Sequence, residues 1–199
     1  DAIPPTEIQA LRNDLLLVRI ETSGVFGKVG AADDFKDSCK TDLEKDPTNG
    51  PALLCLVRYY DKAPGIVGGS KDKARSYLDR LKKSDTHRYW MARAELLDDT
   101  DDPARATAYA KAIAAEARPQ SLLFAAKWSI KRDRFDDAFR YLDTVLAKDP
   151  ENRMALFQFG RAAAHSARRT AQGEDALLVF LSGPTLIRAE DYRARAHAY

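Results

Sequence analysis

This chain of 199 residues has few runs of β-branched residues, which favours helices over strands. No apolar run approaches the roughly 18–20 residues that cross a bilayer, so we expect no membrane span. A strong charge imbalance is also missing, because 32 basic residues face 30 acidic ones. Nucleic-acid binders carry a concentrated basic stripe, so we expect no nucleic-acid partner.

Groups that would support catalysis or metal binding are few and scattered. The three histidines, His87, His165 and His197, lie far apart, and none belongs to a metal-spaced pair. No histidine lies near Cys39 or Cys55 in sequence, which argues against a zinc site. We therefore expect a protein that is not an enzyme and that holds no metal and no cofactor.

One apolar pattern recurs along the chain at a fixed interval. Its clearest copy has Ala138, Leu142 and Val145 on one helical face, followed by Pro150. Copies that begin at Ala106 and Ala74 precede it at intervals of 32 residues, and looser copies lie before and after these three. A fixed period of about 30 to 40 residues indicates a stacked array of helical hairpins.

Helical periodicity, prolines and glycines predict the positions of the helices. The expected ranges are 6–22, 31–43, 52–60, 71–83, 87–97, 104–117, 119–131, 135–148, 153–165, 173–181 and 189–199. Ser70 is an expected N-cap. Gly24, Gly27 and Gly30 place residues 23–30 in a loop, and a connection lengthened by about four residues precedes the helix expected at Gly173.

The repeats resemble those of the tetratricopeptide family. The residues that match its pattern in order are Leu156, Phe159, Gly160, Ala163, Ala176 and Phe180. The resemblance implies an all-α, right-handed α-solenoid of about five helix-turn-helix repeats with a C-terminal capping helix, in a single domain over residues 1–199. The repeats would span residues 7–47, 51–86, 87–118, 119–150 and 153–183, and the capping helix residues 186–199. A related helical repeat class, such as Sel1-like repeats, is the structural alternative.

The resemblance also implies a function, since such arrays bind peptides or partner proteins in a concave groove lined by the first helix of each repeat. The expected groove residues are Arg88, Met91, Glu95, Leu123, Lys127, Ile130, Lys131, Phe157, Arg161 and His165. We expect Leu123, Ile130 and Phe157 to be accessible there. Lys127, Lys131 and Arg161 could hold a carboxylate or an acidic peptide. The alternative is an ordinary solvated helix face.

A second hypothesis assigns the chain to an assembly that docks permanently to itself or to a partner complex. It uses Ile66 and Val67, in the loop 63–69, together with the terminal helix. Apolar loop residues either pack back on the scaffold or await a partner, and packing back is the favoured interpretation. The sequence leaves the oligomeric state and the identity of any partner open.

Cys39 and Cys55 each lie eight residues from Pro47, at the centre of a predicted turn. Residues equidistant from the turn of an antiparallel hairpin sit level, so the two could form a disulfide, and two buried thiols are the alternative. The chain begins at Asp1 without an initiator methionine, which a cleaved signal peptide would explain. We expect a periplasmic or secreted protein, with a cytoplasmic location as the alternative.

Overall fold

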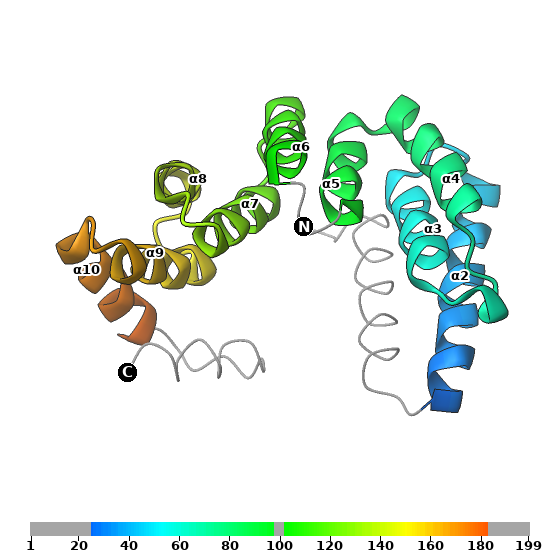
Figure 1. Ribbon diagram of the computed structural model, residues 1–199, viewed down its shortest axis with the longest axis horizontal. Coiled ribbons are helices and arrows are strands. Elements are labelled where there is room, and N and C mark those ends of the chain that lie inside the picture. The colour runs from blue at the N-terminus through cyan, green and yellow to red at the C-terminus, as the bar shows by residue number, and fades with distance from the viewer. Residues whose placement is uncertain (1–24, 98–101, 183–199) are drawn as a thin grey trace. The chain divides into compact units, whose positions relative to one another are not determined.

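The structure is a computed structural model that describes the backbone of residues 25–97 and 102–182 and the side chains from residue 33 onward. The described residues form helices and no strand, which confirms the all-α prediction for this part of the chain. The helices are α2 Val25–Lys45, α3 Gly50–Lys62, the 3₁₀ helix η1 Gly65–Val67, α4 Lys71–Ser84, α5 Thr86–Leu96, α6 Asp102–Ala115, α7 Pro119–Lys131, α8 Phe135–Lys148, α9 Arg153–Ser166 and α10 Thr170–Ser182 (Figure 1).

Polar side chains fix the start of several helices. The Asn49 side chain accepts a hydrogen bond from the amide of Ala52 at 2.9 Å, and Asn152 accepts one from Ala155 at 3.0 Å. Ser70 caps α4 by accepting from the amide of Lys73 at 3.3 Å, as predicted. Each cap satisfies a backbone donor that has no partner inside the helix.

The chain divides into two compact units, residues 1–115 and residues 116–199. In unit 1, α3 packs against α2, α4 and α5, and α5 packs against α6. The core around α3 is dominated by fully buried leucines and aromatic rings, with Phe35, Leu53, Leu56 and Leu81 at its centre. α3 is buried on most sides, as its nearly continuous apolar sequence predicts.

Unit 2 contains α7, α8, α9 and α10. α7 pairs with α8, α9 pairs with α10, and α9 also contacts both α7 and α8. The Phe139 and Phe159 rings lie 5.2 Å apart, and the Phe157 and Phe180 rings lie 5.4 Å apart. These aromatic contacts join α8 to α9 and α9 to α10.

Two predicted boundaries are wrong, and both errors come from glycine. α2 begins at Val25 and so runs through Gly27 and Gly30, which were expected in a loop. α10 begins at Thr170 and includes Gly173, so the connection from α9 is only residues 167–169. Glycine costs about 1 kcal/mol relative to alanine in a helix, which weakens a helix but does not end it. The helices expected at 6–22 and 189–199 lie outside the described residues.

Close packing of α9 on α10 explains the position of Gly173. A Cβ atom at Gly173 would lie far inside van der Waals contact of the Ala163 Cβ. A Cβ at Gly160 would overlap the Leu177 side chain in the same way. Glycine is therefore needed here for the close approach of two helices rather than for a turn.

Candidate functional site

The outer face of α7 carries a basic and aromatic surface. Phe124, Lys127 and Lys131 are spaced i, i+3 and i+7, so they share one side of the helix. Both lysines are exposed, and the Phe124 ring is 45% exposed. Neither lysine pairs with a carboxylate among the described residues. Phe124 was not among the expected groove residues, and its place in the i, i+3, i+7 series was the signal that could have found it.

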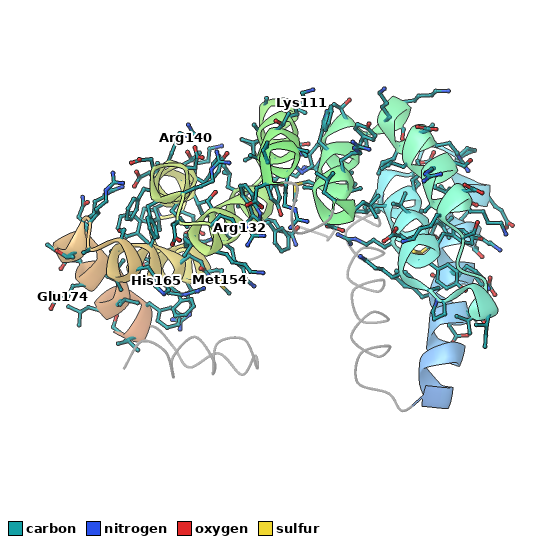
Figure 2. The ribbon with its side chains drawn as sticks, viewed as in Figure 1. Lys111, Arg132, Arg140, Met154, His165 and Glu174 are labelled. Carbon is teal, nitrogen blue, oxygen red and sulfur yellow. A yellow bond between two sulfur atoms is a disulfide. The ribbon has the colours of Figure 1, made fainter. Side chains whose placement is uncertain are left out.

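α9 carries three further basic residues at a spacing of four or eight residues. Arg153, Arg161 and His165 lie along one row of the helix, with Phe157 between the first two. Arg161 is half-buried and its guanidinium donates to the side-chain oxygen of Gln158 at 3.1 Å, while His165 is exposed. In Figure 2, His165 and Met154 extend from the side of α9 that faces away from α8.

Arg153 has unused hydrogen-bonding capacity and was missed by the sequence analysis. Its guanidinium lies over the Phe180 ring at 4.7 Å. The Nε and Nη2 atoms are buried and have no hydrogen-bond acceptor among the described residues. These two nitrogens form the edge of a guanidinium that can bind a carboxylate in a bidentate manner. The protein already covers both atoms, so a ligand reaches them only when the Arg153 side chain moves.

Acidic residues are distributed unevenly among the helices of unit 2. α7 and α9 contain no aspartate or glutamate, whereas α8 contains three aspartates, which all pair with arginines. We call the residues Phe124, Lys127 and Lys131 of α7, with Arg153, Arg161 and His165 of α9, the basic face. α7 and α9 contact each other, so these residues belong to neighbouring helices. The basic face therefore has cations and no carboxylate of its own to neutralise them.

Three apolar residues expected to line the groove are buried instead. Ile130 is 3% exposed, Phe157 is 7% exposed and Met91 is 8% exposed. The accessibility predicted for Ile130 and Phe157 is therefore wrong, and only Leu123 keeps part of its surface. Periodicity gives the direction of a side chain around a helix, but α7 and α9 are contacted by neighbours on more than one side.

The two charged residues expected from α5 take part in contacts within unit 1. Arg88 pairs with Asp85, which also caps α5 by accepting from the Arg88 amide. Glu95 accepts two hydrogen bonds from Arg58 of α3, at 2.6 and 2.8 Å. These residues join α5 to its own N-terminus and to α3, and we do not assign them to the basic face.

The loop 63–69 holds one apolar side chain in solvent. Ile66 is 93% exposed, so the expectation that it packs back on the scaffold is wrong. Val67 is half-buried, and its carbonyl accepts a hydrogen bond from the Tyr59 hydroxyl at 2.6 Å. The loop itself folds back, and the Ile66 side chain does not.

An apolar recess opens on unit 2 between α8 and α10, with α9 as its floor. Its volume is about 350 Å³. Its apolar lining consists of Leu146, Leu156, Phe159, Ala176 and Val179. Asp143 and Arg169 lie at its edge and pair with each other at 2.8 Å, and Asp175 also lines it. Leu156, Phe159 and Ala176 were singled out from the sequence as residues of the repeat pattern, and none of the lining residues was expected to bind a partner.

The structure joins Cys39 of α2 to Cys55 of α3 in a disulfide, with their Cα atoms 6.3 Å apart. Both residues are buried, at 0% and 4% exposure. The pairing agrees with the level positions expected from the Pro47 turn. The disulfide joins α2 to α3 and takes no part in the basic face.

None of the helices described is both long and apolar enough to cross a membrane. No group of three metal-ligating side chains occurs within the described ranges. No family model and no curated protein matches this chain.

Proposed function

We propose that this protein is a non-catalytic interaction scaffold built from stacked helical hairpins of the tetratricopeptide type. In this proposal the basic face of unit 2 binds an acidic segment of a partner protein or an acidic peptide. The solenoid arrangement and the repeats 7–47 to 153–183 form part of the proposal. The pairing of α3 with α4, α5 with α6, α7 with α8 and α9 with α10 supports it, since stacked hairpins pair in this way.

The observation that carries the proposal is the absence of carboxylates on α7 and α9. These helices hold Lys127, Lys131, Arg153 and Arg161, and nothing acidic among their own residues. The aspartates of α8 are already held by arginines, so they do not neutralise this surface. An acidic ligand would supply the missing charge, and Phe124 would supply an apolar contact beside it.

Reversing two charges of the basic face is expected to abolish capture of an acidic peptide. The probe is a fluorescein-labelled peptide of alternating glutamate and leucine, and its anisotropy is measured at low salt. Lys127→Glu with Arg161→Glu should raise the Kd by at least about tenfold, because two attractive charges become repulsive. Binding to the unaltered protein should also weaken as salt rises, since exposed charges are screened.

A matched control reverses the same amount of charge on α8, which contributes nothing to the basic face. Arg140→Glu with Lys148→Glu should leave the Kd within about twofold of the unaltered protein. Arg153→Gln should weaken peptide binding less than the double reversal does, because it removes a single positive charge. Equal loss in the control and the test variant would show non-specific charge attraction and would contradict the proposal.

A second candidate function is favoured by one separate observation, the 93% exposure of Ile66. This second function is the assembly role, in which the loop 63–69 docks to another protein molecule. The terminal helix of that hypothesis lies outside the described residues, so the loop alone supports it. We also propose export to the periplasm or the cell exterior, with the cytoplasm as the alternative, because the Cys39–Cys55 disulfide suits an oxidising compartment.

A further inference from the structure

The loop 63–69 is held in one conformation by its own backbone. The Val67 and Gly69 amides donate to the Pro64 carbonyl at 3.0 Å, and the Gly68 amide donates to Gly65 at 3.0 Å. The Ser70 amide donates to the Tyr60 carbonyl at 2.9 Å, which ties the end of the loop to α3. A Cβ at Gly69 would overlap the Ala63 carbonyl, so the loop also packs closely on its own start.

This rigidity makes Ile66 different from an ordinary exposed apolar residue. Single apolar side chains on a surface are common and need no explanation. Most of them sit on helices or flexible loops, however, and lose freedom when they bind. Ile66 stands on a backbone that is already fixed, so little backbone entropy is lost when a partner covers it. Ile66 is therefore an apolar side chain at a fixed position, and we call it the Ile66 knob.

Positive charge surrounds the base of this knob. The Lys71 ammonium donates to the Asp61 carboxylate at 2.7 Å and to the Asp61 carbonyl at 2.9 Å, which joins the two ends of the loop. Lys62 also pairs with Asp61, at 3.3 Å. Burial by itself raises the pKa of Asp61, but hydrogen bonds from Lys71 and Lys62 bring that pKa below its usual value. Two cations thus share one anion.

The recess between α8 and α10 has the complementary properties. Its wall includes Val179, which is 47% exposed, and its floor is formed by Leu156 and Phe159 of α9. The Asp143–Arg169 pair at its edge is neutral, and Asp175 adds a carboxylate with no pairing partner among the described residues. The recess therefore presents an apolar hollow with an excess negative charge.

We propose that the Ile66 knob of one molecule inserts into the α8–α10 recess of a second copy of this chain. The 350 Å³ hollow is large enough for a branched side chain and its loop neighbours. The lysines beside the knob meet Asp175 beside the recess, so shape and charge agree. Ile66 is 93% exposed, so the described part of its own unit leaves it uncovered, and a second copy of the chain offers the matching recess.

The knob and the recess are different surfaces, so one contact leaves a free recess on the molecule that gives the knob and a free knob on its partner. Association then either closes by a second, reciprocal contact or continues to a ring or an open chain. The interface is small, so association is weak and appears at high protein concentration. This inference rests on the second candidate function, the docking of the loop 63–69. It is independent of the basic face, which lies on α7 and α9 and uses none of the same side chains.

Sedimentation velocity at increasing concentration, up to about 1 mM, tests the proposal. The unaltered protein should associate to a dimer or to larger species. Ile66→Asp removes the knob and Val179→Lys blocks the recess, and each variant alone should stay monomeric. An equimolar mixture of these two variants should form a dimer and nothing larger, because one intact knob meets one intact recess. Leu178→Lys, on the exposed neighbour of Val179 that does not line the recess, is the matched control and should associate normally.

The proposal is overturned if the unaltered protein stays monomeric at every concentration. It is also overturned if the two variants remain monomeric when mixed, or if Leu178→Lys loses association to the same extent. Circular dichroism of each variant shows whether it is folded. Acidic-peptide binding by Ile66→Asp should match the unaltered protein, so failure of self-association and failure of the scaffold role can be told apart.

Discussion

Loss of the Cys39–Cys55 disulfide is expected to lower the free energy of unfolding of unit 1 by about 3 kcal/mol, because a loop of this size constrains the unfolded chain. The two cysteines are 16 residues apart in sequence. Both lie in the core that also contains Phe35 and Leu53, so the reduced thiols would remain packed and the effect would come mainly from the unfolded state. Cys39→Ala with Cys55→Ala should give a similar loss.

The chain offers a separate fluorescent reporter for each unit. It has two tryptophans, Trp90 in α5 of unit 1 and Trp128 in α7 of unit 2. In a Trp128→Phe background, Trp90 reports the urea unfolding of unit 1 with and without a reducing agent. In a Trp90→Phe background, reduction should leave the urea midpoint of unit 2, reported by Trp128, unchanged. A shift below about 0.5 kcal/mol in unit 1 would count against the stabilising role of the disulfide.

Gly173→Ala is expected to destabilise unit 2 by about 2 kcal/mol. Forcing two Cβ atoms into the same space costs about 3 kcal/mol when the groups cannot move apart. Alanine recovers up to about 1 kcal/mol of helix propensity, so overpacking outweighs the gain. The opposing atom is the Cβ of Ala163, which is fixed to the α9 backbone, so relief requires α9 and α10 to separate. Urea unfolding followed at Trp128 measures the loss.

A second substitution shows whether the loss of stability comes from overlap with the Ala163 Cβ or from the presence of alanine at position 173 itself. Ala163→Gly in the Gly173→Ala background moves the methyl group from one helix to the other, so the double variant should recover to within about 1 kcal/mol of the unaltered protein. Gly65→Ala in unit 1, followed at Trp90, is the control for a glycine-to-alanine change without overlap, since no atom lies within 4 Å of a Cβ at that position. A double variant no more stable than Gly173→Ala alone would show that the Ala163 contact is not the cause.

Periodicity and caps predicted most of the helices because those signals are local. The expected ranges 119–131 and 135–148 agree with α7 and α8 at both ends. Pro119 begins α7, and the apolar residues of α8 repeat at helical spacing. At α2, glycines were expected to form a loop, and at α10, Gly173 was expected to be the first helical residue. The role of Gly173 depends on its contact with Ala163 of α9, which no local pattern contains.

Of the residues in the basic face, the sequence singled out Lys127, Lys131, Arg161 and His165 and missed Phe124 and Arg153. Lys127, Lys131 and His165 are exposed, as a polar helix face requires. Ile130 and Phe157 have similar sequence spacing but are buried, while Phe124 is exposed. Whether an apolar residue is covered depends on which neighbouring helices pack on it. The orphaned guanidinium nitrogens of Arg153 likewise depend on burial, which composition does not show.

The sequence by itself determined the all-helical character of the described chain, most helix limits and the level positions of Cys39 and Cys55. Those properties follow from backbone propensities, capping groups and the 3.6-residue period, which act over a few neighbouring residues. Tertiary structure alone decided the burial of Ile130 and Phe157, the exposure of Ile66 and the recess between α8 and α10. These depend on surfaces that meet only after distant helices pack, because packing removes solvent from one face and leaves another open.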